Sequence, residues 1–108
     1  MRNSALPLTE TTYLILLSLL EPRHGYAIIK NVEELSDNHV KIAAGTMYGA
    51  LDNLYKQAWI EEVASENKRR KVYQITEKGK EVLEAEIGRL SNLTALFKSA
   101  GKNSDKSA

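Results

Sequence analysis

The 108-residue sequence contains no cysteine, only two histidines and two prolines, and few aromatic residues. Without cysteine the chain can form neither disulfides nor thiolate metal sites, and this composition fits a reducing compartment. His24 and His39 are not spaced as ligands on one helix face, so we expect neither a metal nor a cofactor. No apolar run reaches the ~18–20 residues that a membrane span needs, and residues 1–8 lack the apolar core of a signal peptide. We therefore expect one soluble, cytoplasmic domain.

Side chains arranged for catalysis are also lacking. The adjacent acidic pairs at residues 33–34 and 61–62 would point to opposite sides of a helix or strand, so neither pair can share a proton. The sequence shows no nucleophile beside a base and no glycine-rich phosphate loop. We therefore expect a protein that is not an enzyme.

Charge is balanced overall, with a formal net charge of +1, but it is unevenly distributed. The basic residues concentrate in a run at positions 68–71 (KRRK). Such runs are usually the solvated tip of a loop. Beside a DNA-binding helix, the same run would contact phosphates.

The first half of the chain has the pattern of three helices. Residues 9–20 are apolar almost all round, so this helix must be buried on two sides, one of them against a second subunit or a ligand. Residues 26–35 form an amphipathic helix, and residues 40–42 alternate like a very short strand. Residues 43–46 lead into a third helix, with four apolar residues on one face: Met47, Leu51, Leu54 and Ala58.

The second half predicts a β-hairpin followed by a long helix. Residues 59–63 and 72–75 have the composition of two strands. Trp59 opens the first strand and is expected to pack in the core against the third helix. Thr76 is a good N-cap for a last helix over residues 77–97, whose apolar residues recur as in a coiled-coil seam.

This order of elements predicts a winged helix-turn-helix, an α+β fold that is mainly α with a small β-hairpin, extended by a long C-terminal helix. We expect a DNA-binding domain at residues 1–76, a dimerisation helix at 77–100 and a disordered polar tail at 101–108. The exposed polar face of the third helix fits the major groove of double-stranded DNA. A basic hairpin can lie along the neighbouring phosphates.

Four segments, taken in order, make the interpretation specific: residues 16–20 (LLSLL), 24–30 (HGYAIIK), 45–54 (GTMYGALDNL) and 69–79 (RRKVYQITEKG). Together they resemble the short class of PadR-family transcriptional regulators over almost the whole chain. The resemblance implies a homodimeric repressor whose first and last helices build the dimer. It also implies a small-molecule effector that releases the protein from DNA, while the two-fold symmetry predicts a palindromic operator.

The predicted site residues fall into three groups. The DNA-binding residues lie on the third helix, just before it and on the basic hairpin: Lys41, Gly45, Thr46, Tyr48, Asn53, Lys56, Lys68, Arg69, Arg70 and Lys71. The dimer-interface residues lie on the first and last helices: Tyr13, Leu14, Leu17, Leu83, Ile87, Leu90, Leu93 and Phe97. A ligand pocket is predicted around four of the latter: Tyr13, Leu17, Leu93 and Phe97.

The chain departs from the family pattern at several positions. The family often has proline where this chain has Ala44 and Gly49, and glycine where it has Ala58. At position 53 the family commonly has arginine or lysine, whereas this chain has asparagine. Asn53 can either pair with adenine or be a plain surface residue. An alternative function for the same fold is a dimeric protein-interaction module without specific DNA binding.

Overall fold

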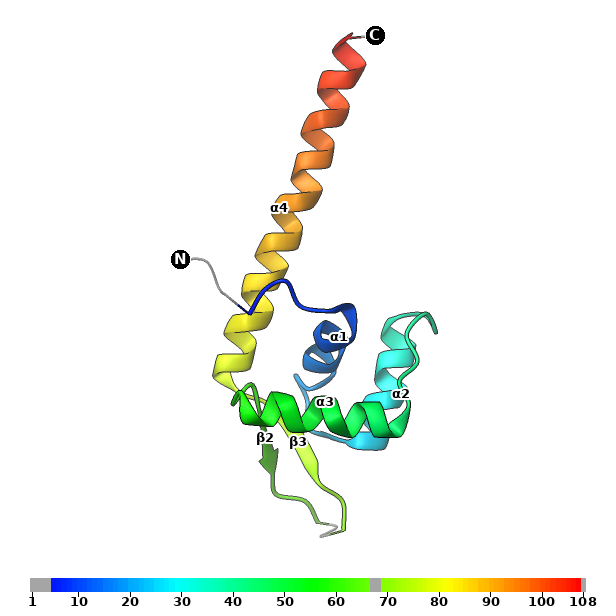
Figure 1. Ribbon diagram of the computed structural model, residues 1–108, viewed down its shortest axis with the longest axis vertical. Helices are drawn as coiled ribbons and strands as arrows, with labels where there is room; N and C mark the ends of the chain where they lie inside the picture. Colours follow the sequence, from blue (N-terminus) through cyan, green and yellow to red (C-terminus); the bar gives the residue numbers. More distant parts are fainter. Residues whose placement is uncertain (1–4, 67–68, 108) are drawn as a thin grey trace.

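The computed structural model describes residues 5–66 and 69–107, with side chains through residue 101. Four helices and three short strands make up this part of the chain (Figure 1). Their bounds are α1 Glu10–Ser18, β1 Arg23–His24, α2 Gly25–Leu35, α3 Ala44–Lys56, β2 Ile60–Val63, β3 Val72–Ile75 and α4 Glu77–Ser107. The predicted fold class, mainly α with a small β-sheet in a winged-helix order, is confirmed.

The core lies where α1, α2 and α3 meet the base of the sheet. Ile15, Leu16 and Leu19 at the centre of this core are fully buried. α1 is held at its start by Thr9, whose hydroxyl accepts from the Thr12 N–H at 3.1 Å. Burial of α1 on more than one side, predicted from its apolar sequence, is therefore achieved largely within the single chain.

The sheet corrects one prediction. Its strand order is β1-β3-β2 and all pairing is antiparallel, with Ile60 opposite Ile75. The strand predicted at residues 40–42 is absent, because these residues pair with no strand and Ile42 simply buries its side chain in the core. Arg23 and His24 instead pair with the free edge of β3, opposite Tyr73 and Val72.

A tight turn joins α3 to β2. α3 ends at Lys56, and Ala58 lies beyond the helix with a φ of 62°, rather than on its apolar face as predicted. The turn is closed by the N–H of Ala58, which donates to the Tyr55 carbonyl at 3.0 Å. Trp59 follows with only 6% of its surface exposed, so its predicted core position is confirmed.

The start of α4 is fixed against this turn. The Thr76 hydroxyl accepts from the Gly79 N–H at 3.0 Å, as an N-cap does, and donates to the Ala58 carbonyl at 2.7 Å. Gly79 is buried so closely that a Cβ there would lie 2.1 Å from the Trp59 carbonyl oxygen. Only glycine fits this contact between helix and turn.

α4 projects from the rest of the chain as a long single helix (Figure 1). Its backbone is helical to Ser107, so the helix neither ends near Phe97 nor gives way to the disordered tail predicted from residue 101. The physical reason is that this segment contains no proline, and each further helical residue adds a backbone hydrogen bond. Within the described ranges, no helix combines the length and the apolar character required to cross a membrane.

Candidate nucleic-acid interface

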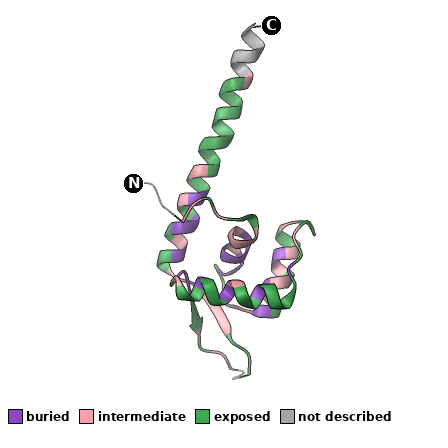
Figure 2. Cartoon of the chain, viewed as in Figure 1, coloured by how far each residue is buried: buried purple, intermediate pink, exposed green. Residues whose placement is uncertain are grey.

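The outer face of α3 carries five of the predicted DNA-binding residues. Met47, Leu51 and Leu54 point into the core and hold the helix against the domain. The opposite face is exposed along the length of the helix (Figure 2), and it includes Gly45, Thr46, Tyr48, Asn53 and Lys56. The structure therefore places these five residues on one accessible surface.

The remaining predicted DNA-binding residues lie on either side of α3. The hairpin of β2 and β3, which we call the wing, hangs below α3 in Figure 1. Just before β3 it exposes Arg69, Arg70 and Lys71. Lys41 is exposed in the segment before α3. Lys68 lies outside the described residues.

A cavity of about 690 Å³ joins the wing to the starts of α2 and α3. We call it the basic pocket, because three of its lining residues are cationic and none is acidic. It is lined by His24, Gly25, Tyr26, Tyr48, Arg69, Arg70, Lys71 and Tyr73. Four predicted DNA-binding residues are thus brought together with four residues that sequence reasoning missed.

Two close contacts organise the basic pocket. Arg70 Nη1 lies 3.3 Å from His24 Nε2, although the two residues are far apart in sequence. The Tyr48 ring packs on the start of α2, where a Cβ on Gly25 would lie 2.7 Å from the Tyr48 hydroxyl oxygen. In the sequence, the HGY segment at residues 24–26 marks the family resemblance, but nothing in it predicts that these residues reach the DNA-binding surface.

The His24 ring lies between two donors, the Ala27 N–H and the Arg70 guanidinium. Its Nδ1 accepts from the Ala27 N–H at 3.4 Å and so caps α2, while Nε2 faces Arg70. A neutral imidazole has a single acceptor nitrogen, so the ring can accept from one of these donors at a time.

Acidic groups lie beside the basic pocket rather than in it. An adjoining cavity is lined in part by Asp52 and Glu62, and Asp52 pairs with Lys56 at 3.2 Å. Burial, followed by the nearby Glu62, raises the pKa of the Tyr73 hydroxyl above its ordinary value. A further neighbouring cavity, beside α2, is lined in part by Glu34.

The predicted dimer-interface residues divide into three sets by their burial. Leu14 and Leu83 are buried in the core of the single chain, so neither is available to a partner in this structure. Tyr13 and Leu17 are half-buried. The other four are exposed on the projecting part of α4, namely Ile87, Leu90, Leu93 and Phe97.

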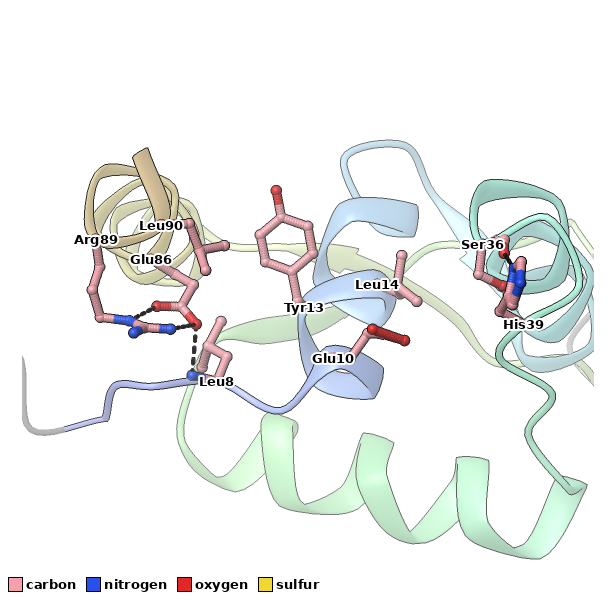
Figure 3. Close-up of a pocket in the computed structure, with 9 residues that line it drawn as sticks. All are labelled: Leu8, Glu10, Tyr13, Leu14, Ser36, His39, Glu86, Arg89 and Leu90. Atoms are coloured by element: carbon pink, nitrogen blue, oxygen red, sulfur yellow. Dashed lines mark hydrogen bonds and ion pairs between the residues drawn. The ribbon is translucent and has the colours of Figure 1, made fainter. Parts of the chain in front are cut away.

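A second cavity, of about 570 Å³, lies between α1, α4 and the end of α2 (Figure 3). Of the four predicted ligand-pocket residues only Tyr13 lines it; Leu17, Leu93 and Phe97 do not. Figure 3 shows Tyr13 standing between α4 and Leu14. The lining is completed by Leu8, Glu10, Leu14, Ser36, His39, Glu86, Arg89 and Leu90.

The buried Glu86 and the partly exposed Arg89 form an ion pair on the α4 side of this second cavity, which the sequence did not predict. Arg89 donates to both carboxylate oxygens of Glu86, and the Leu8 N–H donates to Oε2 at 2.9 Å. The hydrogen bond from Arg89 holds the pKa of Glu86 below its ordinary value. Glu86 thereby ties α4 to the segment that leads into α1.

Among the described residues, no group of three or more histidine or acidic side chains is placed to hold a metal ion.

Comparison with known proteins agrees with this geometry. The model of the transcriptional regulator PadR-like family matches residues 14–85. No curated protein sequence matches the chain.

Solved structures share the fold. A PadR family transcription regulator from Clostridium difficile R20291 aligns with a TM-score of 0.70 and 24% identity, covering 84% of this chain and 97% of that chain. A transcriptional regulator from Clostridium thermocellum aligns with a TM-score of 0.67 and 25% identity, covering 82% and 86%. A PadR family regulator from Eggerthella lenta DSM 2243 aligns with a TM-score of 0.62 and 29% identity, covering 84% and 78%.

Proposed function

We propose that this chain, which belongs to the PadR-like family of transcriptional regulators, is a homodimeric repressor that binds a palindromic DNA operator. Members of the family regulate transcription and bind DNA, and are not enzymes. The observation that carries the proposal is the exposed face of α3 beside the basic pocket. One surface thus offers polar side chains for bases and cationic side chains for phosphates.

The dimensions of α3 suit the major groove. An α-helix fits the groove of B-DNA, and winged helix-turn-helix proteins contact base edges from the first turns of this helix. Thr46 and Tyr48 lie in those turns and Asn53 follows further along the same exposed face. The wing then lies outside the groove, along the backbone.

The exposed stripe on α4 supports a homodimer. Five large apolar side chains of α4 remain 39–79% exposed, namely the predicted Ile87, Leu90, Leu93 and Phe97 together with Leu96. A contiguous apolar stripe of this kind is costly to leave in water and marks an interaction site. Its spacing is that of a helix packed lengthwise on a second helix, which a two-fold axis supplies from a second copy.

A dimer of this kind allows an effector to act through helix spacing. The second cavity, beside the base of α4, is where we place a small-molecule effector of unidentified chemistry. A ligand that favours a dimer whose α3 helices are wrongly spaced would lower operator affinity. Calorimetry with aromatic acids and planar dyes tests this part, and the absence of binding by all of them would remove it.

Paired aspartate substitutions test the dimer. Leu90→Asp with Leu93→Asp should give a monomer by sedimentation equilibrium and weaken DNA binding, because both substitutions place charge on the apolar stripe. Asn92→Asp with Ala95→Asp, at the same spacing on the opposite face of α4, should stay dimeric. A dimeric Leu90/Leu93 variant with undiminished DNA binding would overturn this interface.

A further inference from the structure

We propose that the basic pocket holds a single backbone phosphate of DNA, and that Gly25 and His24 are positioning residues that set its two main contacts, Tyr48 and Arg70. The inference rests on the proposed DNA binding and adds to it a defined phosphate site. It also gives a role to two residues that lie outside both α3 and the wing tip.

The chemistry of the pocket matches a phosphate diester. Arg70 and Lys71 enter it from the wing, Tyr48 enters from α3, and no acidic side chain lines it. An arginine directs several N–H groups from one plane, and a tyrosine hydroxyl donates one more hydrogen bond. Asp52 and Glu62 line one neighbouring cavity and Glu34 lines another, whereas the described lining of the basic pocket is cationic, so a phosphate is favoured in the basic pocket itself.

Gly25 sets the position of Tyr48. The nearest atoms to a Cβ at this position would be the Tyr48 hydroxyl oxygen at 2.7 Å and two ring carbons at 3.0 Å. A side chain at position 25 would therefore push the ring of Tyr48 outward. The absence of a side chain lets Tyr48 lie against the start of α2, with its hydroxyl at the pocket.

His24 sets the position of Arg70. Long side chains on a wing have many rotamers, and fixing one in advance lowers the entropy lost on binding. In the tautomer whose Nε2 is the acceptor nitrogen, the contact of His24 Nε2 with Arg70 Nη1 at 3.3 Å restrains the guanidinium over the pocket. Arginine has five N–H donors, so this contact leaves others for a phosphate.

The His24 contact is tested by a double-mutant cycle that separates it from helix capping. His24→Asn keeps a good N-cap for α2 but is too short to reach Arg70. It should leave thermal unfolding near that of the wild type and weaken binding to a short DNA duplex by about threefold. In an Arg70→Gln background it should have no further effect, because its partner has gone.

The Gly25 contact is tested in the same way. Gly25→Ala should weaken DNA binding about tenfold through displacement of Tyr48, and should lose this effect in a Tyr48→Ala background. Gly88→Ala is the control for the substitution itself, because Gly88 is exposed on α4 and a Cβ there meets nothing within 4 Å. It should leave DNA binding unchanged.

The salt dependence of binding identifies the ligand as a phosphate. Arg70→Gln should lower the slope of log affinity against log salt by ~0.9, the value for one phosphate contact. An unchanged slope, or equal effects of His24→Asn with and without Arg70, would overturn the site. If the wild type binds DNA with a steep salt dependence in these same titrations, such a result rejects the phosphate site alone; if the wild type binds no DNA, the proposed function fails first.

Discussion

Replacing Ala58 by glycine should stabilise the protein. Ala58 has a φ of 62°, in the left-handed region where an L side chain meets the following carbonyl. This conformation costs alanine about 1–2 kcal/mol, while glycine loses about 0.5–1 kcal/mol more in chain entropy on folding. The side chain is exposed and the carbonyl that accepts from Thr76 is kept, so little else changes. The net gain should be about 0.5–1 kcal/mol.

Thermal unfolding at a fixed protein concentration measures this gain. The midpoint of Ala58→Gly should rise by about 4 °C, since ~1 kcal/mol shifts a domain of this size by ~4–8 °C. Ala85→Gly is the matched control, because Ala85 is helical within α4 and glycine costs ~1 kcal/mol there. The same chemical change should thus have opposite signs at the two positions. A loss of stability in Ala58→Gly comparable to that in Ala85→Gly would refute the reasoning.

Substitutions at three further positions probe the base of α4. Gly79→Ala should destabilise by about 3 kcal/mol in urea unfolding, because its Cβ would meet the Trp59 carbonyl at 2.1 Å and must displace backbone; a neutral result would contradict the packing. Thr76→Ala should cost about 1 kcal/mol through loss of the N-cap, whereas Thr76→Ser should restore most of it. Arg89 holds the pKa of Glu86 below its ordinary value of 4.5. The ionised Glu86 therefore stabilises the folded state above pH 4.5, and this stabilisation is lost as the pH falls through the lower pKa of the folded state. Urea midpoints measured across acidic pH should therefore fall less steeply for Glu86→Gln than for the wild type, and parallel curves would argue against the ion pair.

The sequence predicted the elements whose signal is local. The spacing of Met47, Leu51 and Leu54 gave the buried face of α3, and Thr76 gave the start of α4. β1 could not be found in this way, because Arg23 and His24 have no strand pattern and become a strand through pairing with β3. The strand expected at residues 40–42 was wrong for the complementary reason: an alternating triplet needs a partner edge, and this one has none in the structure.

Only part of the site could be predicted from the sequence, because the rest depends on contacts between distant segments. Charge and helix position identified Tyr48 and Arg70, but their partners Gly25 and His24 are brought to them by the packing of α2 against α3 and by the β1–β3 pairing. Leu83 belongs to the heptad-like pattern of α4 and was placed in the dimer interface. It is buried in the single chain, because periodicity identifies an apolar face without saying which element covers it.

The glycine that the family often has at position 58 now has a physical explanation. The turn between α3 and β2 requires a positive φ there, and this chain meets the requirement with Ala58 at a cost. Gly49 is the converse case. It stands within α3 with nothing within 4 Å of a Cβ, so its flexibility is not required by packing in the single chain.

The central claim is that one surface, made by α3 and the basic pocket, binds DNA specifically as part of a dimer. A footprint titration of the protein on genomic DNA fragments, including the region upstream of its own coding sequence, at two salt concentrations tests this most directly. A DNA-binding dimer should protect a palindromic site whose half-sites lie about one helical turn, ~34 Å, apart, and its affinity for this site should fall steeply as salt rises. Weak and uniform binding to every fragment would contradict it and would favour a protein-interaction module instead.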